Sequence, residues 1–147
     1  MLKKYTIVTA FIVFIGLILY LMLNIQQPSL VESVKLEEQY EDFIIHIHVE
    51  GTNNGFQVLR SIQYTGDEQI TIQHRTPLTQ VTIGADNAIF TGSPISKQLE
   101  PGHQYYPQQP MDFSALEKGE HTLYVHTQFF IDGERIDIKS EATISFQ

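Results

Sequence analysis

Two histidines at a strand-like spacing are the first feature of this sequence that could do chemistry. His46 and His48 are two positions apart, which puts side chains on the same face of a β-strand, so both rings could approach one metal ion. A third ligand would come from a neighbouring strand, with His126 or His74 as the candidates. The same alternation places His46 and His48 on the solvent face, where histidine needs no ligand. We therefore expect solvated strand positions, with a metal site at His46, His48 and His126 as the alternative.

Two adjacent tyrosines are the candidates for contacting a protein partner. Tyr105 and Tyr106 lie in a segment from Gln98 to Met111 that is rich in proline and glutamine, a composition typical of loops. Tyrosine offers a large contact area at a low cost in side-chain entropy, so an exposed loop of this kind is a reasonable binding surface. The alternative is that the two side chains alternate across an edge strand, with one of them in the core.

Acidic and hydroxyl side chains give weaker signals. Carboxylates in the predicted turns offer oxygen atoms to calcium, although their spacing is not that of a dedicated calcium loop. These residues are Asp67, Asp86, Asp132, Glu134 and Asp137. No serine lies in a G-x-S-x-G or S-x-x-K frame, and paired acids for glycoside chemistry cannot be chosen by spacing alone. The sequence therefore predicts neither an enzyme nor a bound cofactor.

The elements that must position these residues are short strands. Phe43, Ile45, Ile47 and Val49 alternate with polar residues, which predicts a half-buried strand. Further strands, each ended by turn residues, are predicted by the same pattern. They cover residues 58–64, 69–74, 78–83, 122–131, 135–139 and 142–146. Only Asp112 to Leu116 indicates a helical turn.

The strand pattern predicts a mostly β domain. Asp132-Gly133 separates the strands expected at 122–131 and 135–139, and this dipeptide favours a two-residue type I′ hairpin because both positions need a positive φ. Seven or eight short strands with frequent turns are typical of an antiparallel β-sandwich. A barrel is the alternative closure, because periodicity does not distinguish the two.

An uncharged run precedes this domain. No charged residue occurs between Lys4 and Glu32, and the stretch from Tyr5 to Leu23 is long enough, at about 28 Å, to cross the hydrocarbon core of a bilayer. It is longer than the apolar part of a signal peptide and lacks a small-x-small cleavage site, so we expect an uncleaved transmembrane helix. Lysines before the helix place the N-terminus in the cytoplasm. The expected organisation is a cytoplasmic N-terminus at 1–4, an anchor at 5–24, a stalk at 25–39 and an extracytoplasmic domain at 40–147.

The charge of the outer part restricts its partners. All 17 acidic residues follow the helix, against seven basic ones, which gives the outer part a net charge of −10 with the histidines neutral. Such a surface repels nucleic acid, so no nucleic-acid partner is expected. The chain has no cysteine, so its stability must come from core packing or from bound partners.

The stretch from Leu99 to Val125 resembles the closing half of bacterial extracytoplasmic immunoglobulin-like domains. The resemblance rests on Leu99-Glu100-Pro101-Gly102, Phe113 and the stretch from Leu116 to Val125, which match an L-x-P-G turn, an apolar strand and a G-x-Y-x-L strand in layout. His121 stands where those domains usually have an aromatic residue. The layout is similar to the proteinase-inhibitor-like family of Bacillus-type bacteria and to small membrane-anchored proteins of the same bacteria. The resemblance implies an immunoglobulin-like sandwich and, for the first family, protease inhibition through loops.

Taken together, these features predict a single-pass membrane protein with an extracytoplasmic immunoglobulin-like β-sandwich. We expect it to work by binding, as an adaptor for another protein of the cell envelope, with Tyr105 and Tyr106 as the contact residues. The alternative function is an extracytoplasmic proteinase inhibitor or a metal-binding envelope protein.

Overall fold

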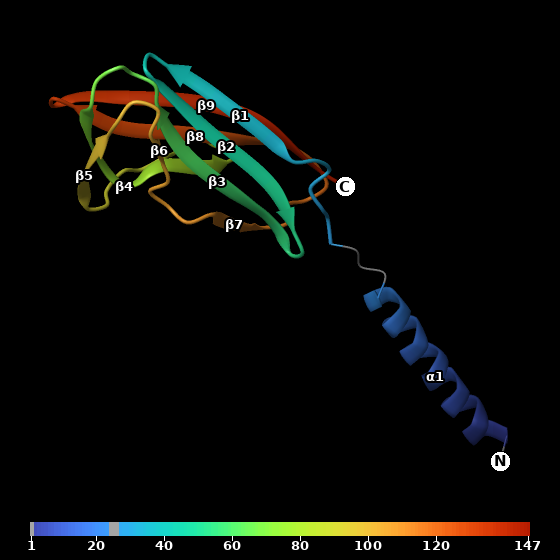
Figure 1. Cartoon of the computed structure of the whole chain (residues 1–147). Helices are drawn as coiled ribbons and strands as arrows, with labels where there is room; N and C mark the ends of the chain where they lie inside the picture. The colour runs from blue at the N-terminus through green and yellow to red at the C-terminus, as the bar shows by residue number, and fades with distance from the viewer. Residues whose placement is uncertain (1, 24–26) are drawn as a thin grey trace.

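Two antiparallel β-sheets in a sandwich-like arrangement make up most of the chain in the computed structural model (Figure 1). The structure describes the backbone of residues 2–23 and 27–147, and the side chains of residues 11–21 and 27–147. The front sheet has the order β1-β2-β3-β6. Strand β7 also pairs with β3, at residues 55–58, whereas β6 pairs with residues 62 and 63. The strands of this sheet are β1 (Val34–Tyr40), β2 (Phe43–Thr52), β3 (Gly55–Tyr64), β6 (Gln104–Tyr105) and β7 (Met111–Ser114).

The back sheet has the order β5-β4-β8-β9. Its strands are β4 (Ile70–Ile83), β5 (Pro94–Leu99), β8 (Gly119–Ile131) and β9 (Glu134–Phe146). Strands β8 and β9 form the hairpin predicted around Asp132-Gly133. Asp132 has φ 50° and Gly133 has φ 85°, as a turn with two positive φ angles requires. The prediction of this hairpin is confirmed.

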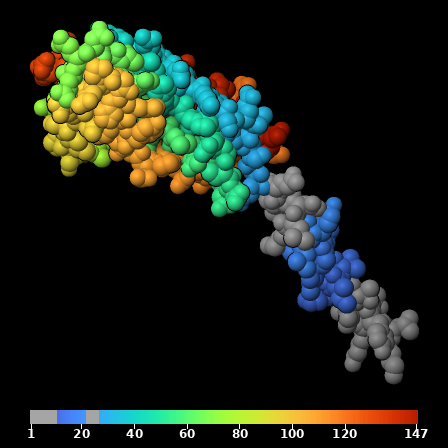
Figure 2. All heavy atoms as spheres, in the orientation of Figure 1, coloured from blue at the N-terminus to red at the C-terminus, as the bar shows by residue number. Residues whose placement is uncertain are grey.

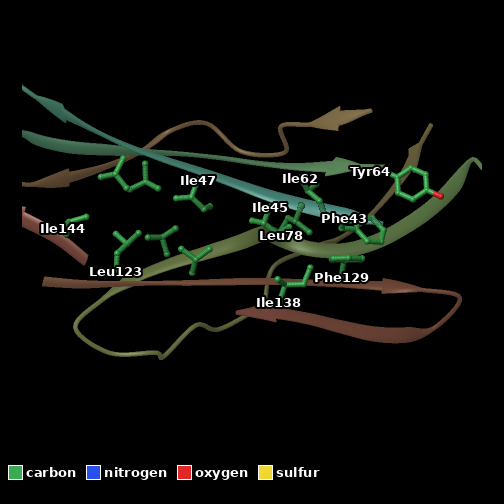
Figure 3. Packing of buried hydrophobic residues seen from close by; sticks show 14 of the residues in the cluster. Phe43, Ile45, Ile47, Ile62, Tyr64, Leu78, Leu123, Phe129, Ile138 and Ile144 are labelled. Atoms are coloured by element: carbon green, nitrogen blue, oxygen red, sulfur yellow. The ribbon is translucent and has the colours of Figure 1, made fainter. Parts of the chain in front are cut away.

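The core lies between the two sheets and is built by alternation. Phe43, Ile45, Ile47 and Val49 of β2 are buried, while the residues between them face outward. Figure 3 shows side chains of the two sheets meeting across this layer, among them Phe43 of β2 and Phe129 of β8, whose ring centroids are 4.8 Å apart. Aromatic pairs at this distance contribute packing energy beyond the apolar area that they bury.

The strands differ from the sequence prediction in several places. Strand β1 occupies residues 34–40, most of which were expected to belong to an irregular stalk at 25–39. Val34 and Leu36 of β1 are half-buried against the core, so the fold begins before Tyr40. Residues 25 and 26 of the expected stalk lie outside the described residues.

The other differences come from pairing between strands. Strand β5, which pairs with β4, was not among the predicted strands. The helical turn expected at 112–116 is wrong, because β7 pairs with β3 in this region and Phe113 stacks on Phe56 with ring centroids 4.9 Å apart. Strand β4 joins two predicted strands, 69–74 and 78–83, into one element across Thr76-Pro77. Similarly, β9 joins 135–139 and 142–146, because the whole of β9 pairs with β8.

Helix α1 (Leu2–Leu23) precedes the sandwich and stands apart from it in Figure 1. Its side chains from Phe11 to Leu21 are exposed, and Figure 2 shows this part of the helix as a narrow extension of the molecule. Within the described residues, no helix meets the length and hydropathy needed to cross a membrane. The last residue of the anchor expected at 5–24 lies outside the described residues.

Candidate binding groove

The outer face of the front sheet brings together candidate residues that are far apart in the sequence. Because Phe43, Ile45 and Ile47 point into the core, His46 and His48 point outward. Antiparallel pairing places Glu37 of β1 on one side of His46 and Ser61 of β3 on the other. Lys35 and Leu59 flank His48 in the same way.

A groove of about 230 Å³ lies over this part of the sheet. Its wall includes Tyr106, which follows β6 and is 65% exposed. The polar side chains of the groove provide donors and acceptors of hydrogen bonds together with one charge of each sign. They are Lys35, Glu37, His46, His48, Ser61 and Gln104; Arg60 also lines the groove, with its guanidinium bonded to backbone carbonyls beneath it. We call this the Tyr106 groove.

Hydrogen bonds fix several of these side chains. His46 Nδ1 is 3.1 Å from Glu37 Oε1, and His46 Nε2 is 3.1 Å from Gln63 Oε1. Gln104 Nε2 donates to Ser61 Oγ over 2.9 Å. Side chains held in this way lose little further entropy when a ligand binds, which favours recognition.

This arrangement does not form a nucleophilic centre, although Ser61, His46 and Glu37 lie in a row across three strands. A serine nucleophile needs a hydrogen bond to the imidazole that removes its proton. Here the imidazole of His46 contacts Glu37 and Gln63, and the Ser61 hydroxyl is held by Gln104. The row therefore lacks the serine–histidine hydrogen bond of a nucleophilic centre in this geometry.

The proposed metal ligands do not come together. His126 lies on the outer face of β8 in the back sheet, with the core between it and the pair His46 and His48. Its Nε2 atom is 2.8 Å from Asp137 Oδ1, and its ring packs against Phe90 with centroids 4.9 Å apart. Among residues 11–21 and 27–147, no three histidine, cysteine or acidic side chains are grouped closely enough to hold a metal ion.

Two of the acidic residues considered for calcium, Asp86 and Asp137, bond to side chains of the protein. Asp137 Oδ2 is 2.8 Å from Arg135 Nε, and Lys139 Nζ donates to Asp86 Oδ2 over 2.8 Å. Partial burial alone would raise the pKa of Asp137, but hydrogen bonds from Gln128 and His126 outweigh it and lower the pKa. The hydrogen bond from Lys139 lowers the pKa of Asp86. Both carboxylates are thus stabilised by donors of the protein itself.

Tyr105 and Tyr106 point in opposite directions, as the edge-strand alternative predicted. Tyr105 faces inward from β6, and its hydroxyl lies 3.1 Å from Nε2 of the buried His74 on β4. The ammonium group of Lys97 lies 5.3 Å from the centroid of the Tyr105 ring. Tyr105 therefore joins the two sheets, and only Tyr106 is available to a partner.

A buried arginine is the main residue that the sequence reading missed. Arg60 is only 6% exposed and points inward from β3, where NH1 donates to the carbonyl oxygen of Thr79 and NH2 to that of Gln109. Burial lowers its pKa, and none of the ion pairs within the described residues involves it. Because Gln109 follows Tyr106 by three residues, this contact holds the segment that forms the wall of the groove. The alternation Val58, Arg60, Ile62 was the signal that could have found it.

Lowering the pH is expected to destabilise the sandwich through His74. Burial lowers the pKa of His74 below 6.5, although the hydrogen bond to the Arg75 carbonyl opposes this shift. The unfolded chain therefore binds the proton more readily than the folded one. The stability contributed by neutral His74 is complete above pH 6.5 and is lost as the pH falls toward the folded-state pKa, by at most about 1.4 kcal/mol per pH unit.

Urea unfolding of the full chain in detergent at a series of pH values tests this expectation. His74→Gln should flatten the decline in unfolding free energy below pH 6.5, whereas the control His48→Gln, on the outer face, should leave the decline unchanged. Equal slopes for the wild type and His74→Gln would contradict the assignment of this pH dependence to His74.

Comparison of the chain with models of known protein families and with the sequences of curated proteins gives no match.

Proposed function

We propose that this chain is a membrane-anchored, extracytoplasmic adaptor that binds an envelope protein in the Tyr106 groove. The observation that carries the proposal is the position of an exposed tyrosine beside fixed polar side chains on one sheet face. Tyrosine and neutral hydrogen-bonding groups are typical of surfaces that recognise proteins. The lining includes Lys35, Glu37 and Arg60, and the Arg60 guanidinium is bonded to the backbone carbonyls of Thr79 and Gln109. The charges that face outward are therefore one lysine and one glutamate, which favour neither a polyanion nor a polycation.

The membrane anchor in this proposal is α1. The helix extends from Leu2 to Leu23, and the sequence carries no charge between Lys4 and Glu32. Its exposed side chains between Phe11 and Leu21 are nearly all apolar, a surface that lipid would cover. Lys3 and Lys4 favour a cytoplasmic N-terminus, which would place the sandwich outside the cell membrane.

We also propose that the sandwich is immunoglobulin-like. Support comes from its two antiparallel sheets and from the resemblance of residues 99–102 and 116–125 to the closing half of such domains. Connections between the two sheets occur after β3, β5 and β7, so successive groups of two or three strands alternate between the layers, as in Greek-key sandwiches.

The inhibitor alternative has less support. A proteinase inhibitor should present an extended, exposed loop, and the longest connection between described strands is 84–93, between β4 and β5. This loop is tied to the back sheet, because Gln80 Nε2 donates to the Ile89 carbonyl over 2.6 Å and Phe90 packs on His126. The adaptor function is therefore the one that we carry forward.

Tyr106→Ala is expected to weaken partner capture by roughly tenfold or more without changing the melting temperature. A central aromatic side chain commonly contributes about 2 kcal/mol or more to a protein interface, while an exposed tyrosine contributes little to folding. The measurement is quantitative recovery of the partner from solubilised membranes by the full chain. Tyr40→Ala is the matched control, since Tyr40 is 41% exposed and lies outside the groove.

The outcomes separate the possibilities. Capture that is lost with Tyr106→Ala and kept with Tyr40→Ala supports binding in the groove. Equal capture by both variants would mean that the partner contacts another surface or the helix. If the wild-type chain retains no protein above background, the adaptor proposal is wrong.

A further inference from the structure

Strand β9 leaves a long edge of the back sheet without a pairing strand. The sheet ends at β9, which pairs with β8 along its whole length. On its other edge, within the described residues, only the last part is covered: Leu30 bridges Phe146, and Val31 N donates to the Ser145 carbonyl. Strand β1 lies near β9 in Figure 1 but pairs with β2. The edge from Glu134 to Ala142 is therefore open to hydrogen bonding with another strand.

Charges alternate in sign along the solvent face of this edge. Arg135 is followed at intervals of two residues by Asp137, Lys139 and Glu141. Side chains two residues apart lie on the same face of a strand, and Ile138 between them is buried in the core. The charges on the solvent face of the edge are thus positive, negative, positive and negative in chain order.

This order is complementary to itself when the strand is reversed. In an antiparallel pair of two β9 strands centred on Ile138, Arg135 of one copy faces Glu141 of the other, and Asp137 faces Lys139. Because the pair is two-fold symmetric, each contact occurs twice. The four charged side chains of this row then lie opposite a charge of the other sign, in addition to the pairs that Asp137 forms with Arg135 and Lys139 forms with Asp86 within one copy.

Neighbouring registers lack this property. A shift that centres the pair on Asp137 places Asp137 opposite itself and Arg135 opposite Lys139. A shift that centres it on Lys139 places Lys139 opposite itself and Asp137 opposite Glu141. A register centred between two residues, such as Asp137 and Ile138, would pair an outward-facing residue of one strand with a core-facing residue of the other. The core side of one sheet would then lie on the solvent side of its partner.

We propose that the chain forms a symmetric homodimer in which two β9 edges pair antiparallel in the register centred on Ile138. Alternating charge can also serve to keep edges apart, but a row of lysines achieves that without being complementary to a second copy. The contact joins two four-stranded back sheets into one continuous sheet across the dimer. It does not involve the Tyr106 groove, which lies on the front sheet.

Cysteine pairing tests the register in the full chain in detergent, because the chain has no cysteine of its own. Mixing the Arg135→Cys and Glu141→Cys variants should give a disulfide-linked dimer, since directly paired residues are about 5 Å apart at Cα, within disulfide reach. Either variant alone should not cross-link. In the proposed register, two copies of residue 135 lie six residues apart along the strand, roughly 20 Å.

Charge reversal tests the basis of the recognition. Arg135→Glu should weaken dimerisation, measured by sedimentation in detergent, by roughly tenfold because it places two acidic side chains opposite each other at two positions. The double variant Arg135→Glu with Glu141→Arg should restore it. Lys118→Glu, an exposed reversal outside β9, is the control, and melting temperatures show whether each variant remains folded.

A chain that stays monomeric and gives no cross-link in the mixture overturns the proposal. So does a dimer that Arg135→Glu and Lys118→Glu weaken equally, since its contact would not depend on the β9 charges. A dimer in which Arg135→Cys cross-links efficiently by itself would contradict the register centred on Ile138.

Discussion

Replacing Phe129 with alanine is expected to lower the free energy of unfolding by about 3 to 5 kcal/mol. The Phe129 side chain is fully buried between the sheets and packs on Phe43 with ring centroids 4.8 Å apart. Truncation removes buried apolar surface and leaves a cavity that neighbouring strands cannot fill without breaking their pairing. A domain of this size has a total stability of about 5 to 15 kcal/mol, so the loss is a large fraction of the total.

Phe130 provides the matched control, because it is the next residue on β8 and points to the outer face. It is only half-buried, and Phe130→Ala should therefore cost about 1 kcal/mol. Both variants are compared by urea unfolding of the full chain in detergent, followed by the intrinsic fluorescence of its seven tyrosines. Equal losses for Phe129→Ala and Phe130→Ala would show that the two faces of β8 are not distinguished as core and surface.

The parts of the fold that could be predicted from sequence are those with strong local signals. Alternation identified β2 and β8, and Asp132-Gly133 identified the hairpin because a turn with two positive φ angles strongly favours such residues. These signals depend on residues close together in the chain. They establish the presence of strands and of antiparallel neighbours, and hence the mostly β class.

The strands that the sequence did not reveal are held by distant partners. Strand β7 is four residues long, and its pairing with β3 overrides any local preference for a turn. Strand β1 alternates only Val34 and Leu36 with charged residues before the pattern ends, which is too short a run to identify an edge strand. In both cases the deciding contacts lie outside the segment itself.

In the candidate site, too, the sequence predicted only what depends on residues close together in the chain. Alternation placed His46 and His48 on one face, but only the sheet order shows that His126 lies on the other side of the core. For Tyr105 and Tyr106 the sequence offered alternation across an edge strand as the alternative to an exposed loop, without indicating which tyrosine would be exposed. The partner that decides this is His74, 31 residues earlier in the chain, whose buried ring bonds to the Tyr105 hydroxyl.

Arg60→Ala is expected to lower the free energy of unfolding by about 3 kcal/mol. The guanidinium donates to the carbonyl oxygens of Thr79 and Gln109 over 3.1 and 2.8 Å, and truncation leaves a cavity and two acceptors without these donors. Burying a cation without an ionic partner destabilises the folded protein, as the lowered pKa of Arg60 indicates. Removing the charge therefore offsets part of the stability lost with the two hydrogen bonds. Arg60→Met, which fills the space without hydrogen bonds, should therefore lose less than Arg60→Ala.

Arg75→Ala is the control for this prediction, because Arg75 is exposed on β4 and makes one bond, 3.2 Å long, to the Gly92 carbonyl. It should change the unfolding free energy by less than about 1 kcal/mol. Both arginine variants are also assayed for partner capture by the full chain. If Arg60 holds the segment from Tyr106 to Gln109, Arg60→Met should weaken capture more than its effect on stability accounts for, while Arg75→Ala should leave capture unchanged. Capture that survives Arg60→Met intact would mean that the wall of the Tyr106 groove keeps its shape without the buried guanidinium.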